Sequence, residues 1–122
     1  MTGFQRKGFQ TVTPRIIVSD PQGLIAFLKE VFHAEGDFVP GRPAEMRIGD
    51  SLVMVSDGVG LRDPMAGFLY VYVEDADCTC RRAIAARATV IEPPTDTPYG
   101  DRRATLRDPW GNLWQIATCK SA

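Results

Sequence analysis

The feature that most constrains this chain is an internal repeat. Residues 13–20 and residues 68–75 are both apolar, strand-like segments that end in Val-x-Asp. In each copy a helix-like stretch follows, and further apolar strands, 51–55 and 113–117, close the unit. A duplicated unit of this kind folds into two matched halves, and matched halves leave a cleft between them. The repeat therefore predicts both an architecture and the place of a binding site.

The first copy predicts a strand, a helix and three further strands. Residues 11–18 are rich in β-branched side chains and are typical of a strand. Asp20 can cap a helix that begins at Pro21, and Gly36 is expected to end it. One stripe of apolar residues recurs at helical spacing: Leu24, Phe27, Leu28, Val31 and Phe32. The strands expected next are a short one at 37–39 and a hairpin of 45–48 and 52–55.

The second copy repeats this plan. The segments expected are a strand at 68–73, a helix capped by Asp75 or Asp77 and running to Ala88, a strand at 89–92, a loop at 93–101 and a hairpin of 102–107 and 113–118. The helix should bury one face, made of Cys80, Ala83, Ile84 and Ala88. Each copy is thus βαβββ, and the fold expected is α+β: two βαβββ modules that form a curved mixed sheet around a cleft, with helices on one face.

The length fits a single domain over residues 1–122. Module one is expected at about 11–57, a Gly- and Pro-containing linker at 58–66, and module two at about 67–119. Residues 1–10 are polar and non-periodic, so they form either a loose arm or a segment that packs on a partner.

Composition excludes several classes of function. A net charge of −1 gives no general attraction to nucleic acid or to anionic membranes. No apolar run approaches the roughly 20 residues that span a bilayer, and residues 1–10 do not have the pattern of a signal peptide. The three cysteines match neither a zinc-finger spacing nor a redox pair, so reduced core thiols are expected. These features predict a cytoplasmic protein.

Several motifs carry a resemblance to a known superfamily. The segments Ile17-Val18-Ser19-Asp20, 47–51, 73–77 and 99–102 contribute to it, and the turn Asp108-Pro109-Trp110-Gly111-Asn112 is its most specific piece. With the paired βαβββ plan, the chain resembles the vicinal-oxygen-chelate superfamily, which includes glyoxalase I, bleomycin-resistance proteins and extradiol dioxygenases, and is most similar to its small glyoxalase-like members. Where relatives often end the second helix with glycine, this chain has Arg87, which predicts either a mildly strained left-handed arginine or a different helix end.

The resemblance also implies four metal-ligand positions, two in each half, which relatives fill with His or Glu. They fall at Thr13, Met54, Phe68 and Gln115. None is a competent ligand for a divalent metal, and Phe68 has no lone pair at all. The single histidine, His33, lies near the end of the first helix, where a surface or cap position is expected. We therefore expect no catalytic metal and no cofactor.

Alternation along the strands predicts the lining of the cleft, because side chains two residues apart share a face. The expected ligand-binding residues on strands are Thr13, Arg15, Met54, Phe68, Tyr70, Tyr72, Leu113 and Gln115, with Leu52 beside Met54. Ile17 shares the face of Arg15, whereas Val12, Ile16 and Val18 should pack under the helices. An apolar wall with a few polar anchors is the composition of a small-molecule pocket. The alternative is that the aromatic residues only fill a closed sheet interior.

Three polar residues of this set have open interpretations. An inward arginine needs a partner, and for Arg15 the candidates are Glu45 or the carboxylate or phosphate of a ligand. Tyr99 and Arg102 either form the lip of the cleft or face solvent. No nucleophile–base pair is recognisable, and Glu45 is the one candidate general base.

The function these residues favour is metal-independent binding of a small apolar or aromatic molecule, of the resistance or sequestration type, with an acidic group of the ligand held by Arg15. The alternatives are a lyase, isomerase or dioxygenase of the same superfamily with an atypical or absent metal, and an interaction module with no small ligand. The resemblance further implies a homodimer, in which the first half of one chain can face the second half of the other.

Overall fold

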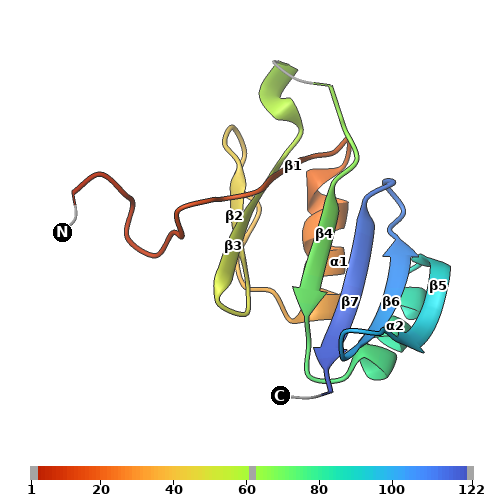
Figure 1. Cartoon of the computed structure of the whole chain (residues 1–122). Helices are drawn as coiled ribbons and strands as arrows, with labels where there is room; N and C mark the ends of the chain where they lie inside the picture. The colour runs from red at the N-terminus through yellow and green to blue at the C-terminus, as the bar shows by residue number, and fades with distance from the viewer. Residues whose placement is uncertain (1–2, 61–62, 121–122) are drawn as a thin grey trace.

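The computed structural model describes residues 3–60 and 63–120, so residues 61 and 62 of the expected linker lie outside the described part. Figure 1 shows the elements in chain order. They are β1 (Arg15–Ile17), α1 (Pro21–Phe32), β2 (Ala44–Ile48), β3 (Ser51–Ser56), a short 3-10 turn (Gly58–Gly60), β4 (Phe68–Tyr72), α2 (Ala76–Ala85), β5 (Thr89–Asp96), β6 (Asp101–Arg107) and β7 (Leu113–Cys119).

The strands form two sheets that repeat one topology. In the order β1-β3-β2, β1 pairs parallel with β3, and β2 pairs antiparallel with β3. In the order β4-β7-β6-β5, β4 pairs parallel with β7, and β6 pairs antiparallel with β7 and β5. The first strand of each half therefore lies beside the last strand of the same half. The α+β fold and its internal duplication are confirmed.

Two strand predictions were wrong in detail. Residues 37–39 form no strand, and the first half has only an isolated bridge between Glu35 and Arg47 in that place. In the second half, β5 extends to Asp96, into the segment expected to be a loop. Pro93 and Pro94 are tolerated there because β5 is an edge strand whose pairing with β6 shifts register around them.

Helix α1 begins as expected and ends earlier. The Asp20 side chain accepts a hydrogen bond from the Gly23 N–H at 3.0 Å, and Pro21 is the first helical residue. The helix ends at Phe32 because His33 adopts the left-handed conformation, with φ of 56°. The prediction that Gly36 ends the helix was wrong, whereas the expected cap position of His33 is confirmed.

Helix α2 is shorter than expected. Asp75 caps it through the Cys78 N–H, and it ends at Ala85 rather than Ala88. Arg87 has φ of 77°, so the left-handed arginine is confirmed. Ile84 was expected on the buried face, but 48% of it is exposed. The residues that α2 buries are Ala76, Thr79, Cys80 and Ala83. Neither helix of the described part is long and apolar enough to cross a membrane.

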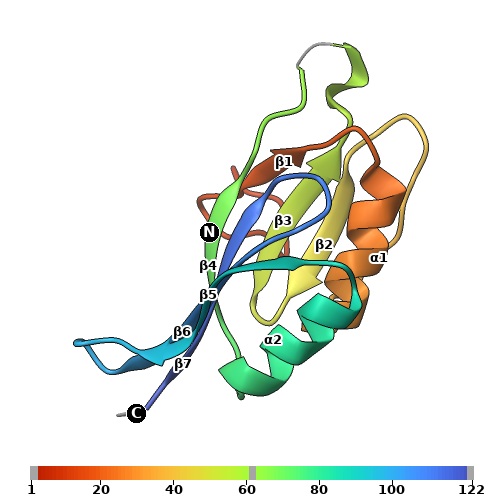
Figure 2. The ribbon, with the colours of Figure 1, turned by 90° about the vertical axis from the view of Figure 1, so that its right-hand side faces the viewer.

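Both helices lie on one side of the two sheets, as Figures 1 and 2 show. One hydrophobic cluster joins the halves, and in it the Phe32 ring packs against Trp114 with centroids 5.2 Å apart. Ile16 and Val18 of the first half belong to this core. Val12 was expected there too, but it precedes β1 and is 77% exposed.

The turn between β6 and β7 is organised by one buried carboxylate. Asp108 is 3% exposed. It accepts hydrogen bonds from the backbone N–H groups of Trp110 and Asn112, and from the side chains Asn112 Nδ2 and Trp114 Nε1, at 2.9–3.0 Å. Asn112 Oδ1 in turn accepts from the Gly67 N–H at 2.8 Å, just before β4. The Asp-Pro-Trp-Gly-Asn motif therefore fixes where β4 starts relative to β7.

Candidate functional site

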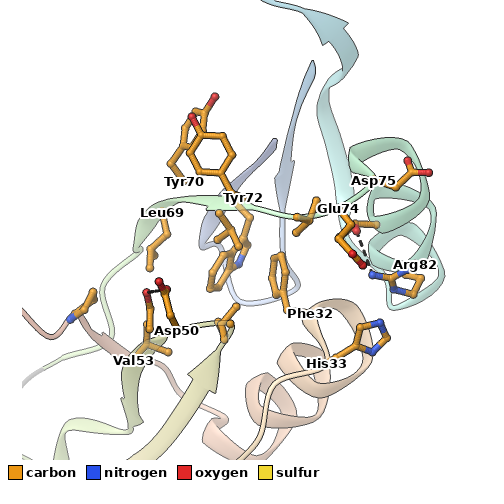
Figure 3. Close-up of a pocket in the computed structure, with 18 of the residues that line it drawn as sticks. Phe32, His33, Asp50, Val53, Leu69, Tyr70, Tyr72, Glu74, Asp75 and Arg82 are labelled. Atoms are coloured by element: carbon orange, nitrogen blue, oxygen red, sulfur yellow. Dashed lines mark hydrogen bonds between the residues drawn. The ribbon is translucent and has the colours of Figure 1, made fainter. Parts of the chain in front are cut away.

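The face of the four-stranded sheet that turns away from the helices carries a group of exposed aromatic residues. Phe68, Tyr70 and Tyr72 alternate with Leu69 and Val71, which pack on the core. Phe68 is 66% exposed, Tyr70 39% and Tyr72 63%. Figure 3 shows the rings of Tyr70 and Tyr72 on the side of β4 opposite to Leu69. We call this surface the open face of the sheet.

A buried carboxylate holds the two tyrosines in place. Asp101, the first residue of β6, is 3% exposed, and its Oδ2 accepts hydrogen bonds from Tyr70 Oη at 2.5 Å and Tyr72 Oη at 2.8 Å. The two rings meet edge to face, with centroids 5.4 Å apart. Burial and the hydrogen bond to Asp101 raise the pKa of Tyr70, and the bond to Asp101 is the main cause that raises the pKa of Tyr72. Both phenols therefore stay protonated at neutral pH.

The network continues across the open face. Tyr99 Oη lies 3.4 Å from Tyr70 Oη and accepts a hydrogen bond from Arg103 Nη1 at 2.7 Å. Arg103 also forms an ion pair with Glu92 at 3.5 Å. Thr105 donates to Glu92 at 2.6 Å, and Gln115 donates weakly to Thr105 at 3.4 Å. The open face thus carries the following predicted residues together: Phe68, Tyr70, Tyr72, Tyr99, Leu113 and Gln115. We call Tyr70, Tyr72, Tyr99 and Asp101 the tyrosine–aspartate cluster.

Sequence reasoning missed Asp101 and Arg103. The strand was expected to begin at Arg102, which left Asp101 in a loop. Ala104 and Leu106 are buried on the helix side, so alternation from them would have placed both missed residues on the open face.

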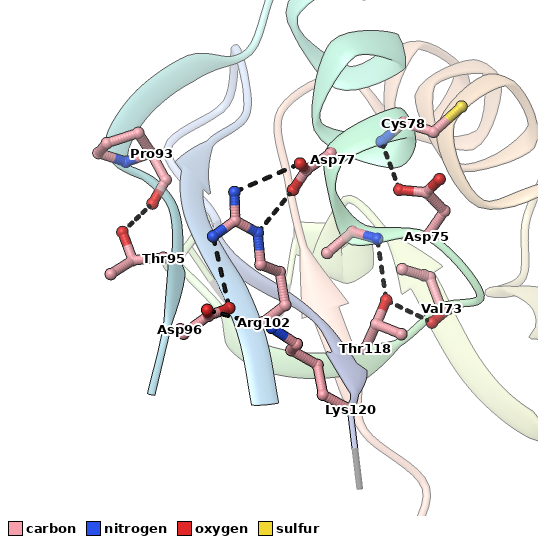
Figure 4. Close-up of polar contacts among 11 residues, drawn as sticks. Val73, Asp75, Asp77, Cys78, Pro93, Thr95, Asp96, Arg102, Thr118 and Lys120 are labelled. Atoms are coloured by element: carbon pink, nitrogen blue, oxygen red, sulfur yellow. Dashed lines mark hydrogen bonds and ion pairs between the residues drawn. The ribbon is translucent and has the colours of Figure 1, made fainter. Parts of the chain in front are cut away.

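Arg102, expected at the lip of the cleft, lies on the other side of β6. Its guanidinium bonds to Asp77 of α2 at 3.1 and 3.3 Å and to Asp96 at 3.4 Å (Figure 4). Lys120 also pairs with Asp96, at 3.1 Å. Arg102 therefore joins α2 to the sheet edge, and Arg103 is the arginine that contacts Tyr99.

The predicted residues Arg15 and Met54 of the first half lie on the other sheet. Arg15, Met54 and Glu45 form one row across β1, β3 and β2 on the face away from α1. Arg15 is exposed and forms no ion pair within residues 3–60 and 63–120, and Glu45 pairs with Arg6 at 2.8 Å instead. The Thr13 hydroxyl is 3.4 Å from the carbonyl oxygen of Gln10.

The N-terminal segment covers part of the same sheet. The Gln10 side chain makes two hydrogen bonds with the backbone of Leu52, at 2.7 and 3.1 Å, and Arg47 donates to the Gly8 carbonyl at 3.0 Å. Leu52 is only 5% exposed as a result.

A cavity of about 810 Å³ opens along the free edge of β4, between the two halves (Figure 3). Phe32, Val53, Leu69, Val71 and Trp114 supply apolar walls, and the polar lining includes His33, Asp50, Glu74, Asp75 and Arg82. Of the residues predicted to bind ligand, Tyr70 and Tyr72 line this cavity. A single chain therefore brings the aromatic residues of β4 and Gln115 together, but places Arg15 and Met54 on a different sheet. Thr13 was expected on a strand of residues 11–18, but β1 begins at Arg15, so Thr13 lies in the segment before it.

Comparison with known proteins identifies the fold family. A family model described as "Glyoxalase/Bleomycin resistance protein/Dioxygenase superfamily" matches residues 9–116. The chain belongs to this superfamily. The protein Mb0911c from Mycobacterium bovis, described as uncharacterized, is 30% identical over 122 residues, covering 86% of this chain and 80% of its own.

Solved structures with the same fold include the following two proteins. The crystal structure of TioX from Micromonospora sp. ML1 superposes with a TM-score of 0.76 and 25% identity, covering 90% of this chain and 98% of TioX. A glyoxalase/bleomycin resistance protein/dioxygenase family enzyme from Burkholderia phytofirmans PsJN has a TM-score of 0.74 and 23% identity, covering 88% and 96% of the two chains.

The four residues that the resemblance implies for metal-ligand positions do not fit a divalent metal. Thr13, Met54, Phe68 and Gln115 offer a hydroxyl, a thioether, no donor and a neutral amide. Within the residues that the structure describes, no three His, Cys, Asp or Glu side chains are grouped so that they could hold a metal ion. The donor set therefore gives no basis for a reaction step through a bound metal.

Proposed function

We propose that this protein is a metal-independent, cytoplasmic binding protein for a small apolar or aromatic molecule, of the resistance or sequestration type. The observation that carries the proposal is the open face of the four-stranded sheet. Phe68 and Tyr72 of β4 lie largely exposed there and Tyr70 partly so, beside a hydrogen-bonded polar network. Apolar surface of this kind, with a few fixed polar groups, is suited to holding a planar ligand.

The polar network supports binding rather than simple packing. Tyr70 and Tyr72 are tied to Asp101, and Tyr99 is tied to Arg103, so most of the site is fixed before a ligand arrives. A fixed surface loses little side-chain entropy on binding. The alternative, that the aromatic residues only fill a sheet interior, is not supported because Phe68 and Tyr72 are exposed in the single chain.

We further propose that the working unit is a homodimer. The hydrogen bonds from Val73 N–H to Ala117 and from Leu113 N–H to Gly67 turn the odd-numbered residues of β4 toward β7. In a parallel pair the backbone groups of Phe68, Tyr70 and Tyr72 then point to the free edge. A partner chain that covers this edge with its first half would bring Arg15 and Met54 of one chain to the tyrosines of the other.

Removing an aromatic side chain of the open face is expected to weaken ligand binding. Quinoline at pH 8 serves as a neutral planar probe for isothermal titration calorimetry with the full chain. Phe68→Ala and Tyr72→Ala should each raise the dissociation constant about ten-fold, because each removes roughly 1–2 kcal/mol of ring contact. Addition of a metal chelator should leave the dissociation constant of the unaltered protein unchanged.

Phe38→Ala is the matched control, because Phe38 is 39% exposed and lies beside Val39 and Arg42, outside the open face. Its dissociation constant should stay within two-fold of the unaltered protein. No saturable binding of quinoline, or an equal loss in Phe38→Ala, would contradict the proposed site.

Arg15 is expected to anchor an acidic group of the ligand. Glu45 pairs with Arg6, so the Arg15 guanidinium is available. Arg15→Ala should weaken binding of 2-naphthoate about ten-fold, the loss expected for a charge-assisted hydrogen bond, while quinoline binding stays unchanged. Because Arg15 is exposed, the free energy of unfolding should change by less than about 0.5 kcal/mol. The control is Arg42→Ala, in an exposed loop, and equal 2-naphthoate affinity in both variants would refute the anchor.

A further inference from the structure

The tyrosine–aspartate cluster contains a negative charge that no basic side chain balances. Asp101 is 3% exposed and forms no ion pair in the described part of the chain. The other two charged groups of the network, Arg103 and Glu92, lie 3.5 Å apart and balance each other. Within the tyrosine–aspartate cluster, the carboxylate beneath the tyrosine hydroxyls therefore keeps a negative charge that no ion pair of the described residues neutralises. In a partly buried place such a charge attracts a cation more strongly than it would in water.

The direction of the hydrogen bonds adds to this preference. An ionised carboxylate only accepts hydrogen bonds, so the hydroxyl protons of Tyr70 and Tyr72 both point to Asp101. The proton of Tyr70 is thus committed, and Tyr99 is the donor in the contact between those two hydroxyls. The proton of Tyr72 is committed in the same way, so its oxygen can act toward a ligand only as an acceptor. The outward-facing lone pairs of that oxygen can accept a hydrogen bond from a ligand.

The rings around the carboxylate also favour a cation. The face of an aromatic ring is electron-rich and attracts a positive charge that lies over it. Phe68, Tyr70 and Tyr72 are exposed on the same side of β4, and Figure 3 shows Tyr70 and Tyr72 side by side there. Their phenols remain neutral donors to Asp101, so the single formal charge of the cluster is that of the carboxylate.

We propose that the tyrosine–aspartate cluster is a recognition subsite for a positively charged nitrogen group on an aromatic ligand. The inference rests on the proposed function and names the class of ligand: a planar molecule with a quaternary or protonated nitrogen at the end that lies on the four-stranded sheet. Asp101 supplies the charge, the tyrosines supply ring faces and acceptor oxygens, and Arg15 remains available for an acidic group elsewhere on the same molecule.

The test compares two probes that differ chiefly in charge. N-methylquinolinium and quinoline at pH 8 have the same ring system, and calorimetric titration of the full chain gives both dissociation constants. N-methylquinolinium is expected to bind about ten-fold more tightly, as a cation near one carboxylate and aromatic rings should. In Asp101→Asn the ratio of the two dissociation constants should fall close to one, while quinoline binds within a factor of about three of its original affinity.

Two further variants separate charge from structure. Tyr72→Phe keeps the ring and the carboxylate, so it should keep most of the preference for the cation. Asp37→Asn removes a negative charge at an exposed position that pairs with Lys29. This variant should keep the full preference for N-methylquinolinium over quinoline. Equal affinity for both probes in the unaltered protein, or the full preference persisting in Asp101→Asn, would overturn the inference.

The salt dependence provides a measurement that needs no variant. Raising the salt from about 0.01 M to about 1 M should reduce the preference for N-methylquinolinium several-fold and leave quinoline affinity nearly constant, because salt screens only the charged pair. A preference that does not change with salt would also overturn the inference. If neither probe binds saturably, it is the proposed function that fails, whereas equal binding of both probes retains that function and removes the cation subsite.

Discussion

Asp108→Ala is expected to lower the free energy of unfolding by about 3–5 kcal/mol. The substitution removes the acceptor for two backbone N–H groups and for the side chains of Asn112 and Trp114. Asn112 is fully buried and Trp114 is 1% exposed, so water cannot easily replace the lost partner. Urea unfolding, followed by the fluorescence of Trp110 and Trp114, measures the change.

Two further variants test whether the loss of stability comes from the lost acceptor at position 108. Asp108→Asn keeps one acceptor oxygen and should fall between the native protein and the alanine variant. Asp63→Ala, at an exposed position, should change the unfolding free energy by less than about 0.5 kcal/mol. Equal unfolding midpoints for Asp108→Ala and Asp63→Ala would show that the turn contributes no stability.

Gly36→Ala is expected to lower the free energy of unfolding by about 3 kcal/mol or more, because a side chain at this position would clash with β2. A Cβ atom on Gly36 would lie 2.3 Å from the carbonyl oxygen of Glu45 and 2.8 Å from Met46 Sδ. The bridge between Glu35 and Arg47, with hydrogen bonds of 2.8 and 2.9 Å, holds these two segments together. The clash can be relieved only by opening that bridge, so thermal unfolding should occur at a clearly lower temperature.

Gly41→Ala is the matched control, because Gly41 also has a positive φ, of 83°, but a Cβ there would meet no atom within 4 Å. Its cost should be only the strain of a left-handed residue, about 1 kcal/mol. The difference between the two variants then measures the close approach at Gly36. Similar losses of unfolding free energy in the two variants would show that β2 can move to relieve the clash at little cost.

The parts of the fold that depend on local pattern could be predicted from the sequence. The cap at Asp20, the stripe that α1 buries and the alternation along β4 all follow from side-chain spacing. Gly36 shows the limit of such reasoning. A glycine after an apolar stripe has the pattern of a helix end, yet its φ of 137° serves the contact with β2, and His33 ends the helix instead.

The polar partners within the site could not be predicted in the same way. Arg102 and Arg103 are adjacent and chemically identical, and because side chains alternate along β6, Arg103 contacts Tyr99 while Arg102 reaches Asp77. Asp101 was missed because the strand was expected to begin one residue later, at Arg102. The pairing of Glu45 with Arg6 depends on where residues 3–10 lie, which has no periodic signal.

The free edge of β4 has a consequence for how the protein behaves in a crowded cell. The strand reads Phe-Leu-Tyr-Val-Tyr, with high β-propensity and without charge, proline or glycine. An uncovered edge of this composition is a template for misassociation, because any extended chain can pair with its unused backbone groups. A partner chain that covers β4, as in the proposed homodimer, would therefore also keep the protein from aggregating. Variants that uncover this strand should be lost into inclusion bodies while their folded chains still have native stability.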